Sequence, residues 1–81
     1  MPKLRVLKSK EIIKFLKQQG FVVDRQKGSH IVLAKTISFS KQVLTIPKHN
    51  TLDKGTIKAL YNQISRFVPE TEIQELFYTK S

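Results

Sequence analysis

The segment FVVDRQKGSHIVLAKTISFSKQVLTIP, residues 21–47, carries the strongest structural signal in the sequence. Turn-forming residues separate three runs rich in β-branched and aromatic residues, which cover 21–23, 30–35 and 42–46. Gly28 and Ser29 predict a tight hairpin between the first two strands, a loop is expected around residues 36–41, and Pro47 ends the third strand because it has no amide to donate. Connections this short join antiparallel neighbours, so the segment predicts a three-stranded antiparallel sheet.

Helical patterns flank this segment on both sides. Before it, Ser9 is a candidate N-cap and Gly20 a natural stop, which predicts a helix over about residues 10–19. After it, a second helix is expected to start shortly after Asp53, because apolar residues recur at i, i+3, i+4 and i+7: Ile57, Leu60, Tyr61 and Ile64. A short third helix is expected over about residues 69–77, where a proline and two acids precede the apolar positions.

The whole chain, residues 1–81, is expected to form one small domain. The element order predicts an α+β fold, α-β-β-β-α with a short C-terminal helix, in which the helices cover one face of the sheet. This outline resembles a double-stranded-RNA-binding domain. The sequence has no cysteine, so it offers no disulfide framework and no thiol nucleophile, and its apolar runs are too short for a membrane span. We therefore expect a cytoplasmic protein with no membrane partner.

The charge of the chain is large and unevenly distributed. Fifteen Lys and Arg against six Asp and Glu give a net charge of +9. Residues 1–58 hold 13 basic and 3 acidic residues, a net +10, whereas residues 59–81 hold 2 and 3, a net −1. Such an excess attracts polyanions, so nucleic acid is the first partner to consider, and it should dock on the first two thirds of the chain.

His30 is the strongest candidate for a catalytic group. It opens the second strand directly after the turn, and strand alternation points it away from Ile31 and towards solvent. It could act as a general base on an RNA 2′-hydroxyl while neighbouring cations stabilise the charge on phosphorus, or it could be no more than a polar residue beside a turn. The acids Asp24 and Asp53 are not paired by any spacing, so the sequence favours neither a metal site nor a cofactor.

Three further residues have open interpretations. His49 could be a general acid for the leaving oxygen, or it could cap or bridge a loop. Ser29 could hydrogen-bond a phosphate or simply stabilise the turn. Phe39, which lies in a polar loop, could stack on a base or contact a partner protein, or it could anchor the loop.

Four stretches together resemble the HicA family of toxin-antitoxin mRNA interferases, and the resemblance covers roughly residues 8–77. They are Gly20-Phe21, Arg25-Gln26-Lys27-Gly28-Ser29-His30, Thr45-Ile46-Pro47-Lys48-His49 and Leu52-Asp53-Lys54-Gly55-Thr56-Ile57. The combination is specific, although each stretch alone is not. The chain departs from the family pattern at Ile31-Val32 and at residues 62–67.

This resemblance implies a small metal-independent RNA endonuclease that a HicB antitoxin holds inactive. The catalytic histidine of the family falls on His30, Gly28 and Ser29 form the turn that presents it, and His49 occupies a supporting position. The candidate contacts to RNA phosphates are Arg25, Lys27, Ser29 and Lys48.

We therefore expect an endoribonuclease that cleaves mRNA. A non-catalytic RNA-binding module of the same fold is the alternative, and it predicts the same salt-sensitive binding without turnover. A protein-only adaptor is a third possibility, and it predicts no affinity for RNA.

Overall fold

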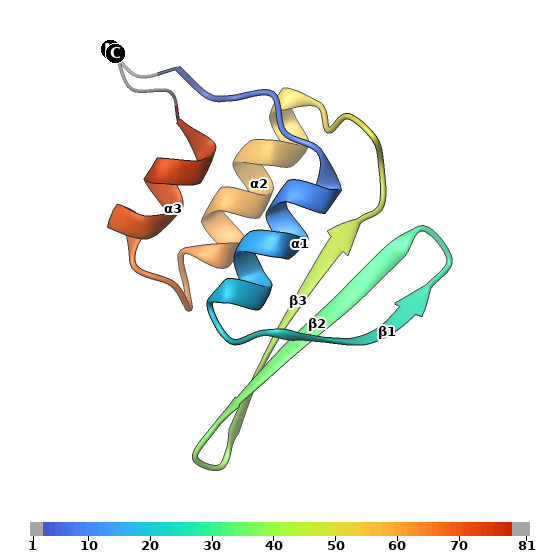
Figure 1. Cartoon of the computed structure of the whole chain (residues 1–81), viewed down its shortest axis with the longest axis vertical. Coiled ribbons are helices and arrows are strands. Elements are labelled where there is room, and N and C mark those ends of the chain that lie inside the picture. The colour runs from blue at the N-terminus through green and yellow to red at the C-terminus, as the bar shows by residue number, and fades with distance from the viewer. Residues whose placement is uncertain (1–2, 79–81) are drawn as a thin grey trace.

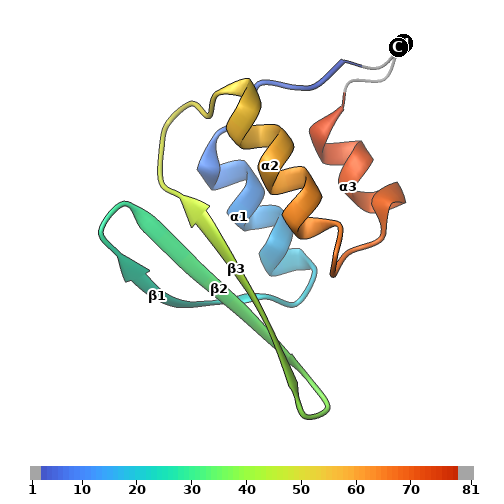
Figure 2. The ribbon, with the colours of Figure 1, turned by 180° about the vertical axis from the view of Figure 1, so that it is seen from behind.

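The structure, a computed structural model, describes residues 3–78, which form a three-stranded sheet with a layer of three helices on one side of it (Figure 1). The elements in chain order are α1 (Ser9–Gln18), β1 (Val22–Lys27), β2 (His30–Ile37), β3 (Ser40–Pro47), α2 (Lys54–Ile64) and α3 (Glu70–Phe77). The strand order is β1-β2-β3 and both pairings are antiparallel. The reverse view in Figure 2 shows the same separation of helices and sheet. The predicted α+β architecture is confirmed.

The core lies between the helices and the helix-facing side of the sheet. Leu33 on β2 is fully buried and pairs with Leu44 on β3, and Ile31 pairs with the fully buried Ile46. The helices contribute the other side of this core through Ile12, Leu16, Ile57, Leu60, Ile64, Ile73 and Phe77. Burial of each such side chain stabilises the fold by roughly 1.5–3 kcal/mol, before the cost of ordering the chain.

Helix α1 ends as its sequence predicts and begins differently. Gly20 has a φ of +98°, and the amides of Gly20 and Phe21 donate to the carbonyls of Lys17 and Leu16 in a Schellman arrangement. At the other end the N-cap is Lys8, whose amide donates to Glu11 Oε1 at 3.1 Å. The prediction of Ser9 as N-cap is therefore wrong, because Ser9 is already helical and its hydroxyl bonds to a distant loop.

The connection between β2 and β3 is shorter than expected. Instead of a loop over residues 36–41, both strands continue to a two-residue turn at Ser38 and Phe39, and Ile37 pairs with Ser40. Ser38 adopts a φ of +54°, which a non-glycine residue rarely takes. A tight turn at this position is therefore not predicted from the sequence. Phe39 is 106% exposed at the tip, so it does not anchor the turn to the core.

Helix α2 is capped by Asp53, whose Oδ1 accepts the Thr56 amide at 2.7 Å. Hydrogen bonding, chiefly from the Thr56 amide, lowers the pKa of Asp53 because it favours the charged carboxylate. This end of α2 is thus occupied by the chain's own carboxylate and is not an open site for an anion.

The two ends of the described chain meet beside the helical layer. Leu4 forms an isolated antiparallel bridge with Tyr78, and the Arg5 amide donates to the Phe77 carbonyl at 2.7 Å. The Arg5 side chain adds a second bond, from Nη1 to the Leu76 carbonyl at 2.9 Å. We refer to these contacts, which join Leu4 and Arg5 to residues 76–78, as the terminal clasp.

Candidate nucleic-acid interface

His30 lies next to the turn of the hairpin formed by β1 and β2. Lys27 and His30 are paired across the two strands, so Gly28 and Ser29 are the two turn residues, and Gly28 has a φ of +62° that suits glycine. On its other side His30 pairs with Pro47 of β3. His30 is exposed, whereas Ile31 is half-buried and Leu33 is fully buried. The imidazole is therefore accessible on the side of the sheet away from the helices.

A β-bulge determines which charges share this face with His30. The register shifts between Val23 and Arg25, so Arg25 pairs with Val32 and Lys27 pairs with His30. Without this shift, Asp24 would face Val32 and Arg25 would turn towards the helices. The bulge thus places two cations on the face of His30 and removes a carboxylate from the paired positions. We call Arg25, Lys27 and His30 the hairpin patch.

Lys48 adjoins the hairpin patch through the backbone. Its amide donates to the Ser29 carbonyl at 2.6 Å, which extends the pairing of β2 and β3 past Pro47. Lys48, Ser29 and Lys27 are all exposed. Three of the predicted phosphate contacts therefore lie at one end of the sheet: Lys27 at the end of β1, Ser29 in the turn and Lys48 after β3.

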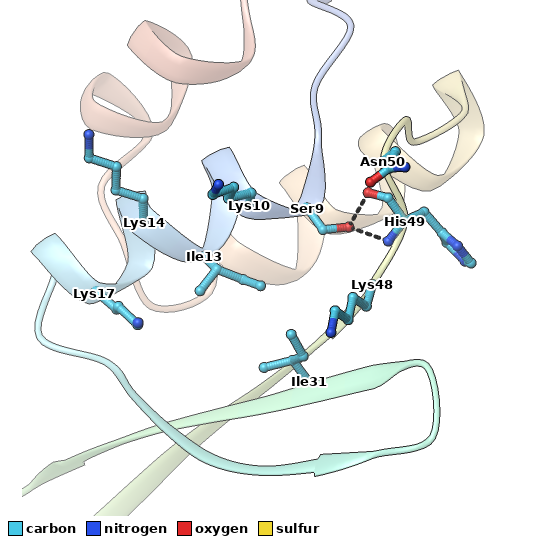
Figure 3. Close-up of a pocket in the computed structure, with 9 residues that line it drawn as sticks. All are labelled: Ser9, Lys10, Ile13, Lys14, Lys17, Ile31, Lys48, His49 and Asn50. Carbon is cyan, nitrogen blue, oxygen red and sulfur yellow. Dashed lines mark hydrogen bonds between the residues drawn. The ribbon is translucent and has the colours of Figure 1, made fainter.

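His49 is held by its backbone and not by its ring. Its amide donates to Ser9 Oγ at 2.8 Å, and the single proton of the Ser9 hydroxyl is within hydrogen-bond reach of the His49 carbonyl, at 2.9 Å, and of the Pro47 carbonyl. Figure 3 shows the two bonds between Ser9 and His49 and shows the imidazole pointing away from α1. Ser9 is only 3% exposed. It thereby fixes the loop after β3, and with it the position of Lys48, against the first turn of α1.

One other lysine that looks available from the sequence is already engaged. Lys35 Nζ donates to the Gln19 carbonyl at 2.7 Å and lies 5.9 Å from the centroid of the Phe21 ring. These contacts hold its ammonium group at the end of α1. Conversely, three lysines of α1 that sequence reasoning left outside the site line a pocket with Lys48: Lys10, Lys14 and Lys17.

Within residues 3–78, no three His, Cys, Asp or Glu side chains lie close enough together to hold a metal ion. None of the helices in the same part of the chain combines the length and the apolar character of a membrane span.

Comparison with known proteins identifies a family. A family model described as the HicA toxin of bacterial toxin-antitoxin matches residues 9–65. The matched segment begins at Ser9 and ends at the residue after α2, so it contains the hairpin patch, Lys48 and His49. Neither a curated protein nor a solved structure matches the chain significantly.

Proposed function

Because the chain belongs to the HicA family of toxins of bacterial toxin-antitoxin systems, whose model matches more than half of its length, we propose that it is a metal-independent endoribonuclease that cleaves mRNA at the hairpin patch. The observation that carries the proposal is the accessible imidazole of His30 beside the ammonium-bearing Lys27, its cross-strand partner.

In the proposed reaction His30 acts as the general base. Its neutral imidazole takes the proton of an RNA 2′-hydroxyl, the 2′-oxygen bonds to the adjacent phosphorus, and the bond from phosphorus to the 5′-oxygen breaks. The departing 5′-oxygen takes a proton from water, and the hydroxide that remains takes the proton of the His30 imidazolium, which restores both groups. The products are a 2′,3′-cyclic phosphate and a free 5′-hydroxyl, so atoms and charges balance without a metal ion or cofactor.

The cations of the site have a separate role. Lys27 and Arg25 share the face of His30, where they can stabilise the negative charge that develops on the phosphoryl oxygens. Lys48 and the Ser29 hydroxyl can hold a neighbouring phosphate, because the backbone bond between these two residues keeps them together. Gly28 supports the site by allowing the turn, and His49 supports it through its bonds to Ser9.

The decisive experiment compares the two histidines of the chain. Wild-type protein, His30→Ala and His49→Ala are incubated with RNA in the presence of EDTA, and fragment ends are analysed for cyclic phosphate. We expect His30→Ala to cleave roughly 10²–10⁴-fold more slowly, the usual contribution of a general base. His49→Ala keeps its backbone bonds and should retain most activity.

The same assay separates the proposed enzyme from a non-catalytic RNA-binding module. A wild-type protein that binds RNA in a salt-dependent manner and yields no fragments would establish the module instead. Cleavage at the wild-type rate by a folded His30→Ala variant would leave the nuclease but remove His30 from its mechanism.

We further propose that the antitoxin, a HicB-like protein, inhibits by covering the hairpin patch with an acidic surface. Opposite charge on the two partners would speed their encounter. Charge reversal at Lys27 and Lys48 should therefore slow association with the antitoxin and weaken RNA binding together, whereas reversal at Lys54 and Lys58 on α2 serves as the control. A complex in which the antitoxin contacts only residues 59–81 and leaves His30 open would contradict this arrangement.

A further inference from the structure

A second basic feature lies on the helical side of the sheet, next to the hairpin patch. It is a pocket of about 820 Å³ between α1 and the ends of β2 and β3. Figure 3 shows α1 on one side of it and Ile31 and Lys48 on the other. We call it the α1 groove, and its lining is formed by Ser9, Lys10, Ile13, Lys14, Lys17, Ile31, Lys48, His49 and Asn50.

The lining of the α1 groove is positively charged and contains no acid. Lys10, Lys14 and Lys17 follow i, i+4 and i+7 spacing, so they form one stripe along α1 that extends about 10 Å at 1.5 Å per residue. Lys48 contributes a fourth ammonium group from the opposite wall. Within residues 3–78 none of these four groups takes part in a hydrogen bond or an ion pair through its side chain. Their charge is therefore available to an anionic ligand.

The α1 groove also offers apolar contact. Ile13 and Ile31 are each half-buried, and Figure 3 shows both side chains reaching into the space between helix and sheet. Cations that flank an apolar surface suit a ligand with a charged backbone and flat bases, because phosphates reach the ammonium groups while a base lies on the apolar surface. The volume is within the range of pockets that enclose small organic ligands.

Two residues connect the α1 groove to the hairpin patch. Ile31 lines the groove and directly follows His30, whose side chain lies on the opposite face of the sheet. Lys48 lines the groove as well, and its amide is bonded to the Ser29 carbonyl in the turn before His30. A strand that leaves the groove past Lys48 therefore arrives at the end of the hairpin where His30 is exposed.

We propose that the α1 groove binds the single-stranded RNA segment that adjoins the scissile phosphate, with phosphates on the lysines of α1 and a base against Ile13 and Ile31. The proposal rests on the ribonuclease function proposed above and extends the substrate site to a second surface. It favours RNA over an acidic protein segment because two lining residues, Ile31 and Lys48, adjoin the hairpin end that carries His30. It favours a single strand because only unpaired bases can turn out of a helix and lie against the apolar side chains of an open groove.

The test uses the full chain with His30→Ala, which is expected to slow cleavage strongly, and a short fluorescein-labelled oligouridylate. Binding is measured by anisotropy between about 50 and 200 mM salt. Lys10→Ala with Lys17→Ala removes two charges from the groove, and Lys54→Ala with Lys58→Ala removes two charges from α2 as the matched control. Circular dichroism verifies that both double variants are folded.

The expected result follows from counterion release. Each phosphate contact to a single strand contributes about 0.7 to the slope of log affinity against log salt, so the groove variant should lose about 1.4. Extrapolated from 1 M salt, this loss weakens binding about 25-fold at 0.1 M. The control should keep its slope. Equal losses in the two variants would show that only overall charge matters, and the proposal would be wrong.

A second measurement reports on the apolar part of the α1 groove. In protein labelled at isoleucine methyl groups, the oligouridylate should shift the NMR signals of Ile13 and Ile31 and leave buried Ile73 of α3 unchanged. Absence of these shifts under saturating RNA would refute contact with a base. Loss of antitoxin binding in the groove variant, with RNA binding intact, would assign the groove to the partner protein and also overturn the proposal.

The groove proposal and the proposed function fail in different ways. If wild-type protein cleaves RNA but the groove variant binds RNA like the control, the proposed ribonuclease function is supported and the proposed RNA binding in the α1 groove is wrong. If the groove variant loses RNA binding as expected and wild-type protein does not cleave RNA, RNA binding in the α1 groove is supported and the catalytic role of His30 is wrong.

Discussion

Replacement of Ser9 by alanine should destabilise the protein far more than its small size suggests. The Ser9 hydroxyl lies within hydrogen-bond reach of three backbone groups at the end of β3 and in the loop after it: the His49 amide at 2.8 Å, the His49 carbonyl at 2.9 Å and the Pro47 carbonyl. Ser9→Ala leaves the His49 amide without that acceptor in a region where Ser9 itself is 3% exposed. The bond between the His49 amide and Ser9 is part-buried, and a donor that loses its partner in such a place costs about 1–3 kcal/mol. We therefore expect a loss of about 2 kcal/mol in the free energy of unfolding.

The measurement is urea denaturation followed by circular dichroism, with thermal melting as a second readout. In a domain of this size, 2 kcal/mol corresponds to a decrease of roughly 8–16 °C in Tm. Ser65→Ala is the matched control, because the Ser65 hydroxyl donates to the Asn62 carbonyl at 2.8 Å on the exposed surface. It should cost less than about 0.5 kcal/mol. If Ser9→Ala is no more destabilising than Ser65→Ala, the hydroxyl does not hold the loop and our account of how Lys48 is positioned is refuted.

The turns and the cap of α2 give further predictions. Gly20→Ala should destabilise by about 1–2 kcal/mol, the cost of a left-handed conformation, plus any cost of moving Lys35, whose Cε lies 3.1 Å from the added Cβ. Gly28→Ala has a positive φ but open space around it, so urea denaturation should show a smaller loss. For Asp53, the bond from the Thr56 amide lowers the pKa, so its contribution to stability is complete above the ordinary pKa of about 3.9 and is lost as the pH falls below it. The Tm of the wild type should therefore fall relative to that of Asp53→Asn as the pH is lowered below about 3.9, and a pH-independent difference would contradict this role of Asp53.

Much of the fold could be predicted because its signals are local. Gly20 and Gly28 occupy positions that require a positive φ, and Asp53 stands where α2 needs an acceptor. The two wrong predictions arise at two serines, one with an unusual local conformation and one with a tertiary contact. Ser38 takes a positive φ without being glycine, so the strands on either side are longer than a polar sequence suggests. Ser9 has the side chain of an N-cap but bonds to a loop 40 residues away.

The residues of the candidate site could be selected from the sequence, but the face of the sheet on which each residue lies could not all be predicted. His30 and Lys27 flank a recognisable turn, so their proximity follows from the sequence. The placement of Arg25 does not, because simple alternation through β1 would have turned it towards the helices, and only the bulge between Val23 and Arg25 returns it to the face of His30. The stripe of lysines on α1 is visible in the sequence, but an exposed helix face carries the same pattern. Only the packing of α1 over Ile31 makes it one wall of a pocket.

The terminal clasp makes this domain suitable for circular permutation. Since Leu4 and Tyr78 lie side by side, a short linker could join the two ends, and new ends could be opened at the turn between Ser38 and Phe39. In the permuted chain the three helices would follow one another without a strand between them. The pairing of β2 and β3 is the most local one in the present chain, but in the permuted chain these strands would lie at opposite ends of the sequence. Formation of that pairing would then require closure of nearly the whole polypeptide, so the permuted protein should fold more slowly to the same structure.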